Sequence, residues 1–209
     1  MQNNLEWIVF DLGGVVVNLD IEGVQEELAR RSATDRTVIE SFTRTRDASG
    51  LSPDEKLHRG LLEIEEYVSL MNQVLTRRLK PEEMIDLRLQ VIQGEDEEVL
   101  EIIRALSLSR KVACFSNTHA IHWNHMLANY RSLRLFHRRI ASHLIRAAKP
   151  EPEAFAIVSR ELNATPAGCL LIDDALVNVE AARAFGWHAI HFRTAAGLRA
   201  DLQTYGITV

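Results

Sequence analysis

Residues capable of chemistry follow three separate apolar runs in this chain of 209 residues. They are Asp11, then Ser116 with Asn117 and Thr118, then Asp173 with Asp174. Lys149, directly before Pro150, adds a cation. Carboxylates brought together from different strands repel one another unless a hard cation lies between them, and Mg²⁺ binds carboxylates, waters and phosphate oxygens. If these residues meet, the pattern indicates a Mg²⁺ site that receives a phosphate group.

The three apolar runs, 7–10, 111–115 and 169–172, have the length and composition of buried strands. Helical patterns alternate with them after residue 94, a weak strand signal lies at 140–141, and a last strand is predicted over 188–192. This alternation predicts a parallel sheet with helices on both faces. The carboxyl ends of such strands share one edge, where open α/β sheets bind ligands. Gly13 and Gly14 would let the backbone turn sharply there and approach a ligand.

A helical segment separates the first strand from the others. Apolar residues recur at intervals of three and four from residue 20 to about residue 93. The predicted helices cover 22–31, 36–44, 53–66, 67–80 and 81–93. Asp20 and Ile21 lead into the first of them, Thr34 with Asp35 offers a cap for the second, and Ser52 is a suitable N-cap for the third. The segment therefore indicates a separate helical module inserted after the first strand.

Composition limits the classes of function. A net charge of −5 and a pI near 5.9 offer no basic surface for nucleic acid. No run approaches 18 apolar residues, and the first residues, MQNNLEW, lack the features of a signal peptide, so we expect a cytoplasmic protein without a membrane partner. Cys114 and Cys169 lie in apolar runs, which predicts buried thiols rather than a disulfide framework.

Taken singly, each candidate residue also has a structural interpretation. Asp11 would close an Asx turn after its strand. Ser116 would cap the helix near His119, Asp173 and Asp174 would cap the helix that follows them, and Lys149 would be a solvated cation. Only the coincidence of all of them at strand ends favours the chemical interpretation.

Four segments, in their order along the chain, resemble the motifs of the haloacid dehalogenase superfamily. These are FDLGGVVV, FSNT, AAKPEPEAF and LLIDDALVNVEAARAFG. They look most like those of its phosphatases with a helical cap, in particular bacterial sugar phosphatases of the type acting on glucose 1-phosphate. The resemblance implies a Rossmann-like, doubly wound parallel sheet core, formed by residues 1–17 and 94–209, with an inserted all-helical cap over 18–93.

The resemblance also implies a role for each motif residue. Asp11 would attack phosphorus, giving an aspartyl-phosphate, with Ser116 and Lys149 as the other catalytic residues. The phosphate would be bound by Gly13, Gly14, Ser116, Asn117 and Lys149. Mg²⁺ would be held by Asp11, the Gly13 carbonyl, Asp173 and Asp174. The expected enzyme is a Mg²⁺-dependent phosphatase of a small phosphorylated metabolite.

One position departs from the resemblance. Many phosphatases of this superfamily carry a second Asp two residues after the nucleophile as general acid and base, but this chain has Gly13. We therefore expect a preference for good leaving groups, such as anomeric or acyl phosphates, unless Asp20 or Asp47 supplies the proton. Two alternatives remain: a 2-haloacid dehalogenase, and a non-catalytic binding protein of the same fold.

The residues that select the substrate are harder to identify from sequence. The predicted turn over 47–52 resembles the family's cap loop, so Arg44, Arg46 and Asp47 are candidates for contacts to a sugar or carboxylate. His119 and His122 follow the second motif closely and are further candidates for substrate contact.

Overall fold

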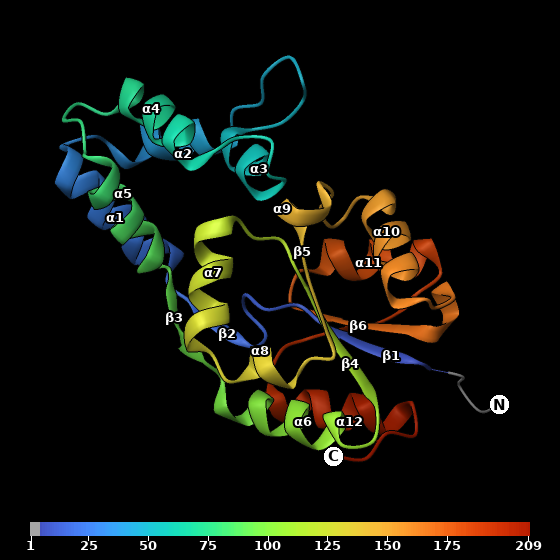
Figure 1. The fold of residues 1–209 in the computed structure, drawn as a ribbon. Coiled ribbons are helices and arrows are strands. Elements are labelled where there is room, and N and C mark those ends of the chain that lie inside the picture. Colours follow the sequence, from blue (N-terminus) through green and yellow to red (C-terminus); the bar gives the residue numbers. More distant parts are fainter. Residues whose placement is uncertain (1–4) are drawn as a thin grey trace.

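A parallel sheet lies at the centre of the computed structural model, which describes residues 5–209 (Figure 1). The five strands lie in the order β5-β4-β1-β6-β7. Their bounds are β1 (Trp7–Phe10), β4 (Lys111–Ser116), β5 (Arg138–Ala141), β6 (Cys169–Asp173) and β7 (His188–His191). Every neighbouring pair is parallel, and β1 lies between β4 and β6. The predicted α/β sheet is confirmed.

Helices cover both faces of the sheet (Figure 1). On one face lie α6 (Glu97–Ser107), α7 (Ala120–Asn129), α8 (Ser132–Leu135) and α12 (Ala195–Thr204); on the other lie α10 (Pro152–Leu162) and α11 (Leu176–Phe185). Side chains of β1 alternate between the two: Ile8 and Phe10 join the first core, and Trp7 and Val9 join the second. Because both faces are buried, the strand is continuously apolar.

Five further helices form a separate layer with its own apolar core. They are α1 (Ile21–Ser32), α2 (Arg36–Arg44), α3 (Pro53–His58), α4 (Ile64–Val74) and α5 (Pro81–Leu89). The predicted cap at Asp35 is confirmed, because Asp35 accepts from the Thr37 amide at 2.8 Å. Asp20 caps α1 in the same way, accepting from the Gly23 amide at 2.8 Å. Ser52 forms a capping box with Glu55. This layer is the inserted helical unit expected from the sequence.

A small antiparallel sheet, which the sequence did not predict, joins this layer to the core. It consists of β2 (Val17–Leu19) and β3 (Ile92–Glu95), and it ends the helix predicted over 81–93 at Leu89. Each strand is short and finds its partner far along the chain, so no local period indicates it. The domain boundaries proposed from sequence, at 17/18 and 93/94, fall within this sheet.

The helix predicted over 53–66 is interrupted after His58. Gly60 has a φ of +62°, and a Cβ atom there would lie 2.6 Å from the His143 carbonyl oxygen. The chain therefore leaves the helix where it contacts α9 (Ser142–Ile145) of the core. The next helix begins at Ile64 and ends at Val74, rather than covering 67–80.

Cys114 and Cys169 are both free and buried, as predicted. Among residues 5–209, no helix combines the length and the apolar composition needed to cross a lipid bilayer.

Candidate active site

A tight turn after β1 presents Asp11 at the carboxyl edge of the sheet. The Leu12 carbonyl accepts hydrogen bonds from the amides of Val16 and Val17, each at 2.8 Å. Gly14 makes this turn with a φ of +75°, and a Cβ atom there would lie only 2.3 Å from Asp174 Oδ2. The positive φ and the close approach to the Asp174 carboxylate therefore both favour glycine at this position.

Lys149 is a buried cation between two carboxylates. Its Nζ lies 3.0 Å from Asp11 Oδ1 and 2.6 Å from Asp173 Oδ2, and its side chain is fully buried. Burial disfavours the ammonium, but Asp11 and Asp173 outweigh this effect and raise the pKa of Lys149. Burial also raises the pKa of Asp11 to about 6, an effect that Lys149 opposes and Asp173 reinforces. Lys149 is thus part of the site and not a solvated cation.

The two members of the acidic pair differ in environment. Asp173 is fully buried, and its Oδ1 accepts from the Ala175 amide at 2.9 Å and from Asn178 Nδ2 at 3.0 Å. It therefore binds Asn178 of α11 as well as Lys149, but the N-cap of α11 is Ala175 and no side chain caps this helix, so the capping interpretation is wrong. Asp174 is the more exposed of the two. Its pKa is raised, mainly because its carboxyl group is partly desolvated and secondly because the charge of Asp173 lies nearby. Asp174 is the member free to take up a cation.

The three carboxylates form a group suited to a metal ion. Asp11, Asp173 and Asp174 each offer a ligand atom, and these atoms lie within 4.8 Å of one another. An all-oxygen, strongly anionic donor set matches the preference of hard cations such as Mg²⁺. The residues present therefore fit the Mg²⁺ site expected from sequence.

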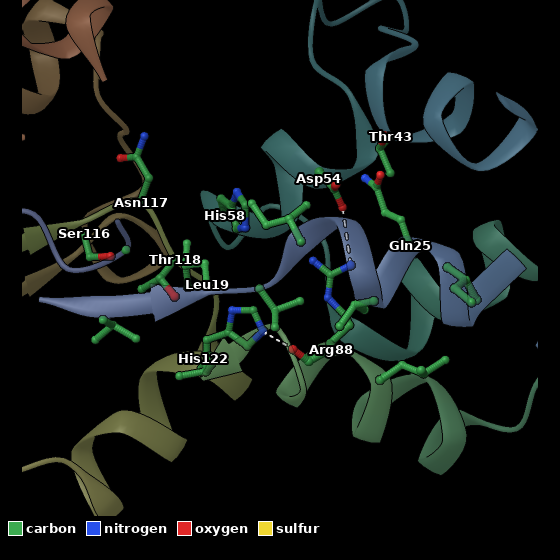
Figure 2. Close-up of a pocket in the computed structure, with 18 of the residues that line it drawn as sticks. Leu19, Gln25, Thr43, Asp54, His58, Arg88, Ser116, Asn117, Thr118 and His122 are labelled. Atoms are coloured by element: carbon green, nitrogen blue, oxygen red, sulfur yellow. Dashed lines mark hydrogen bonds and ion pairs between the residues drawn. The ribbon is translucent and has the colours of Figure 1, made fainter. Parts of the chain in front are cut away.

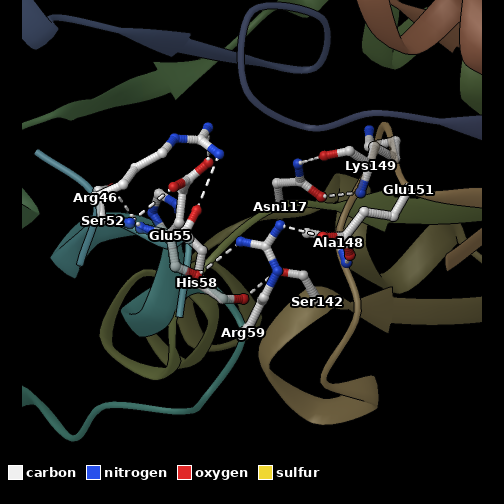
Figure 3. A network of polar contacts seen from close by, with 11 residues as sticks. Arg46, Ser52, Glu55, His58, Arg59, Asn117, Ser142, Ala148, Lys149 and Glu151 are labelled. Carbon is white, nitrogen blue, oxygen red and sulfur yellow. Dashed lines mark hydrogen bonds and ion pairs between the residues drawn. The ribbon is translucent and has the colours of Figure 1, made fainter. Parts of the chain in front are cut away.

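Ser116 and Asn117 extend the site from the end of β4. Ser116 is buried and lines the same cavity as Asp11 and Asp174. The N-cap of α7 is His119, so Ser116 is not the helix cap. The Asn117 side chain donates to the Lys149 carbonyl at 2.7 Å and accepts from the Lys149 amide at 3.0 Å (Figure 3). This clamp on the Lys149 backbone is a role that sequence reasoning missed.

The helical layer contacts the Lys149 loop through an ion pair (Figure 3). Arg59 Nη2, just after α3, lies 2.6 Å from Glu151 Oε1. Glu151 in turn accepts a hydrogen bond from the Ala148 amide at 3.2 Å, directly beside Lys149. The position of α3 is therefore linked to the loop that carries the buried cation.

A cavity of about 390 Å³ leads from the sheet edge into the helical layer. Asp11, Gly13, Ser116, Asn117 and Asp174 line it at the sheet edge. Farther along it are His122, His58, Arg88 and Asp54, with Gln25 and Thr43 beyond them (Figure 2). Its other walls are largely apolar. This size and composition are typical of a small-molecule site.

The residues that line the helical end differ from those expected. In the described part of the chain, Arg44, Arg46 and Asp47 are not among the lining residues. Arg46 pairs with Glu55, and Asp47 pairs with Lys56 on the outer surface of the layer. Of the two predicted histidines, His122 lines the cavity.

Three lining residues, Asp54, His58 and Arg88, were missed from sequence. Charged side chains on short helices usually face solvent, so only their packing against the core reveals them. Asp20, one of the two proposed proton donors, caps α1. Neither Asp20 nor Asp47 belongs to the cavity wall formed by residues 5–209.

Residues 5–186 match the family described as haloacid dehalogenase-like hydrolase. The chain is 24% identical over 202 residues to a D-ribitol-5-phosphate phosphatase of Bacteroides thetaiotaomicron, a match that covers 93% of this chain and 95% of that protein.

Solved structures share the fold. A haloacid dehalogenase family enzyme from Bacteroides thetaiotaomicron, in complex with magnesium and inorganic phosphate, has a TM-score of 0.78 and 22% identity, covering 90% of this chain and 94% of that one. A HAD-like family hydrolase from Porphyromonas gingivalis has a TM-score of 0.80 and 22% identity, covering 95% and 98%. L-2-haloacid dehalogenase from Xanthobacter autotrophicus has a TM-score of 0.62 and 18% identity, covering 96% and 83%. At these identities the likeness shows a common fold.

Proposed function

Because the chain belongs to the haloacid dehalogenase-like hydrolase family, we propose that it is a Mg²⁺-dependent phosphatase of small phosphorylated metabolites, with Asp11 as nucleophile. One observation carries the proposal: Lys149 Nζ lies between Asp11 and Asp173, beside a group of carboxylates suited to a hard cation. Phosphoryl transfer requires mainly positioning and neutralisation of negative charge, which this arrangement supplies.

The proposed reaction has two steps. An Asp11 carboxylate oxygen attacks phosphorus, and the bond from phosphorus to the leaving oxygen breaks with its electron pair on that oxygen. Water then attacks the phosphorus of the aspartyl-phosphate, and the bond from phosphorus to the Asp11 oxygen breaks with its electron pair on the carboxylate. Inorganic phosphate is released, and the proton lost by the attacking water passes to solvent. The Ser116 hydroxyl and the backbone amide of Asn117 donate hydrogen bonds to phosphoryl oxygens, and Lys149 balances the negative charge of these oxygens.

A metal ion would complete the charge balance. Asp11, Asp174 and the Gly13 carbonyl would hold Mg²⁺, with Asp173 directly or through water. The bound ion would supply further neutralisation of the phosphoryl oxygens.

Gly13 shapes the choice of substrate. A glycine cannot protonate the leaving oxygen, and general acid catalysis is worth about 10² to 10⁴ in rate. The proton would therefore come from water or from the substrate, which favours leaving groups that need little help, such as an anomeric sugar oxygen or an acyl group. The D-ribitol-5-phosphate phosphatase among the relatives supports a small phosphorylated carbohydrate or polyol as the substrate class.

The test is hydrolysis of sugar 1-phosphates, sugar 5- and 6-phosphates, acyl phosphates and an aryl phosphate, with Mg²⁺ and with chelator. We expect Mg²⁺-dependent turnover that is lost in Asp11→Asn and retained in Asp201→Asn, a matched change of an exposed carboxylate on α12. Turnover that survives in Asp11→Asn would contradict the proposal. Halide release from a 2-haloacid without Mg²⁺, with no phosphatase activity, would favour the dehalogenase alternative.

A further inference from the structure

A second polar group lies in the cavity, away from the phosphate end (Figure 2). It is centred on Arg88, whose guanidinium carbon lies 4.5 Å from the centre of the Tyr67 ring. Arg88 Nη1 lies 3.5 Å from Asp54 Oδ1, and Arg88 Nε donates to His119 Nε2 at 3.3 Å. The separation from Asp54 is longer than that of a good hydrogen bond, so the two charges attract without satisfying each other.

Buried polar atoms around Arg88 also lack partners. Within residues 5–209, Asp54 Oδ1, Tyr67 Oη and His119 Nδ1 are inaccessible to solvent and have no hydrogen-bond partner. Tyr67 is completely buried, and both Tyr67 and Asp54 belong to the cavity wall. Unsatisfied buried polar groups are costly and are uncommon in native structures. The Arg88 and Asp54 side chains remain 17% and 28% exposed, so each keeps atoms that a polar ligand in the cavity can reach.

The charge of this group is balanced. Arg88 and Asp54 carry opposite charges, and burial lowers the pKa of His58 and of His122 to about 4, so both imidazoles are neutral near pH 7. A second anionic group on the ligand would be attracted by Arg88 but repelled by Asp54. Arg88 and Asp54 together suit a neutral group that accepts a hydrogen bond from the guanidinium and donates one to the carboxylate. A hydroxyl group can do both.

We propose that Arg88 and Asp54 determine the substrate specificity of this enzyme by binding hydroxyl groups of a neutral, polyhydroxylated leaving group. This inference rests on the proposed function, because it concerns the part of the substrate that remains after the phosphate is removed. Apolar side chains of the cavity wall, including Leu19 and Met126, would pack against the carbon chain. Gln25 and Thr43 add polar groups at the far end (Figure 2).

Two substrates with the same leaving-group chemistry test this assignment. Ribitol 5-phosphate and pentyl phosphate are both five-carbon primary alkyl phosphates, so the absence of a general acid at Gly13 affects them equally. We expect wild-type kcat/KM to favour ribitol 5-phosphate, because a hydrogen bond to a charged group contributes about 10- to 100-fold to binding. Asp54→Asn and Arg88→Met should each remove about that factor for ribitol 5-phosphate, mainly through KM, and leave pentyl phosphate nearly unchanged.

A matched control is available in the helical layer. Arg46→Met removes a guanidinium that pairs with Glu55 outside the cavity, and it should preserve the preference for ribitol 5-phosphate. Thermal unfolding checks that each variant is folded. If Arg88→Met is not, Asp54→Asn, which has the same size and shape as the wild-type side chain, decides the question.

Equal kcat/KM for the two substrates in the wild type would overturn the inference, as would an equal loss for both in Asp54→Asn. If Mg²⁺-dependent turnover is retained, neither result would contradict the proposed phosphatase activity. If the wild type hydrolyses neither substrate, calorimetric binding of both to Asp11→Asn decides instead. Tighter binding of ribitol 5-phosphate that is lost on adding Asp54→Asn supports the inference, and equal affinities overturn it.

Discussion

Alanine at position 14 would separate the metal-binding role of Asp174 from the stability of the turn after β1. The added Cβ atom would lie 2.3 Å from Asp174 Oδ2 and 2.8 Å from Asp174 Cγ, so the carboxylate must move by about 0.7 Å to reach a separation of 3.0 Å. The end of an exposed side chain moves at little cost in folding free energy. In the proposed enzyme, however, that same movement displaces a Mg²⁺ ligand.

The backbone also contributes a cost, which a second glycine measures separately. Gly14 has a φ of +75°, where alanine costs roughly 1 to 2 kcal/mol. Gly50 has a φ of +76°, but a Cβ atom there would meet nothing within 4 Å. Gly14→Ala and Gly50→Ala should therefore lower the free energy of unfolding by similar amounts in denaturant titrations without Mg²⁺.

Only the first variant should impair the site. We expect Gly14→Ala to weaken Mg²⁺ binding about 10- to 100-fold in calorimetric titration and to lower kcat/KM on an aryl phosphate about 100-fold, since misplacement by about 1 Å costs that much. Gly50→Ala should match the wild type in Mg²⁺ affinity and in kcat/KM. Normal Mg²⁺ affinity in Gly14→Ala would refute the assignment of Asp174 as a ligand held against this turn.

Three further predictions concern separate features of the molecule. Gly13→Asp should raise kcat on an alkyl phosphate by about 10² to 10⁴, because it restores a general acid; an unchanged rate would show that proton donation does not limit turnover. In a double-mutant cycle, Arg59→Met and Glu151→Gln should couple by about 0.5 to 1 kcal/mol in urea unfolding, since their side chains are 10% and 41% exposed; additive effects would mean that this contact stabilises nothing. Stability should fall as the pH drops from about 6.5 towards 4, because the unfolded imidazoles of His58 and His122 take up protons that the folded ones, with pKa values lowered to about 4, do not. The expected loss is roughly 1 to 3 kcal/mol per histidine, and unfolding that is independent of pH in this range would contradict it.

The sheet could be predicted because its signals are local. The runs that became β1, β4 and β6 are buried on both faces, so each is continuously apolar and ends abruptly in polar residues. Helix starts could equally be predicted where a side chain caps the helix, as Asp35 and Ser52 do. In these cases the residues that determine the structure are neighbours in the sequence.

Features made by distant partners could not be predicted in this way. The pairing of β2 with β3 depends on residues at opposite ends of the helical insertion. The break after α3 depends on the contact between Gly60 and His143 of the core. The same limit applies to the site. Asp11 and Lys149 could be predicted from strand ends and motif order, but Asp54 and Arg88 become partly buried in the cavity wall only when the two layers pack together.

The contacts of Arg88 also explain how the two ends of the cavity are held at a fixed separation. His119 and His122, at the start of α7, contact Arg88 from the core side: Arg88 Nε donates to His119 Nε2, and His122 Nε2 donates to the Arg88 carbonyl at 2.7 Å. Because α7 begins just after Ser116 and Asn117, the same short segment positions the phosphate end and the Arg88 end. These hydrogen bonds therefore fix the distance between the phosphate end and the Arg88 end of the cavity. The enzyme should accordingly select its substrates by length as well as by their hydroxyl groups.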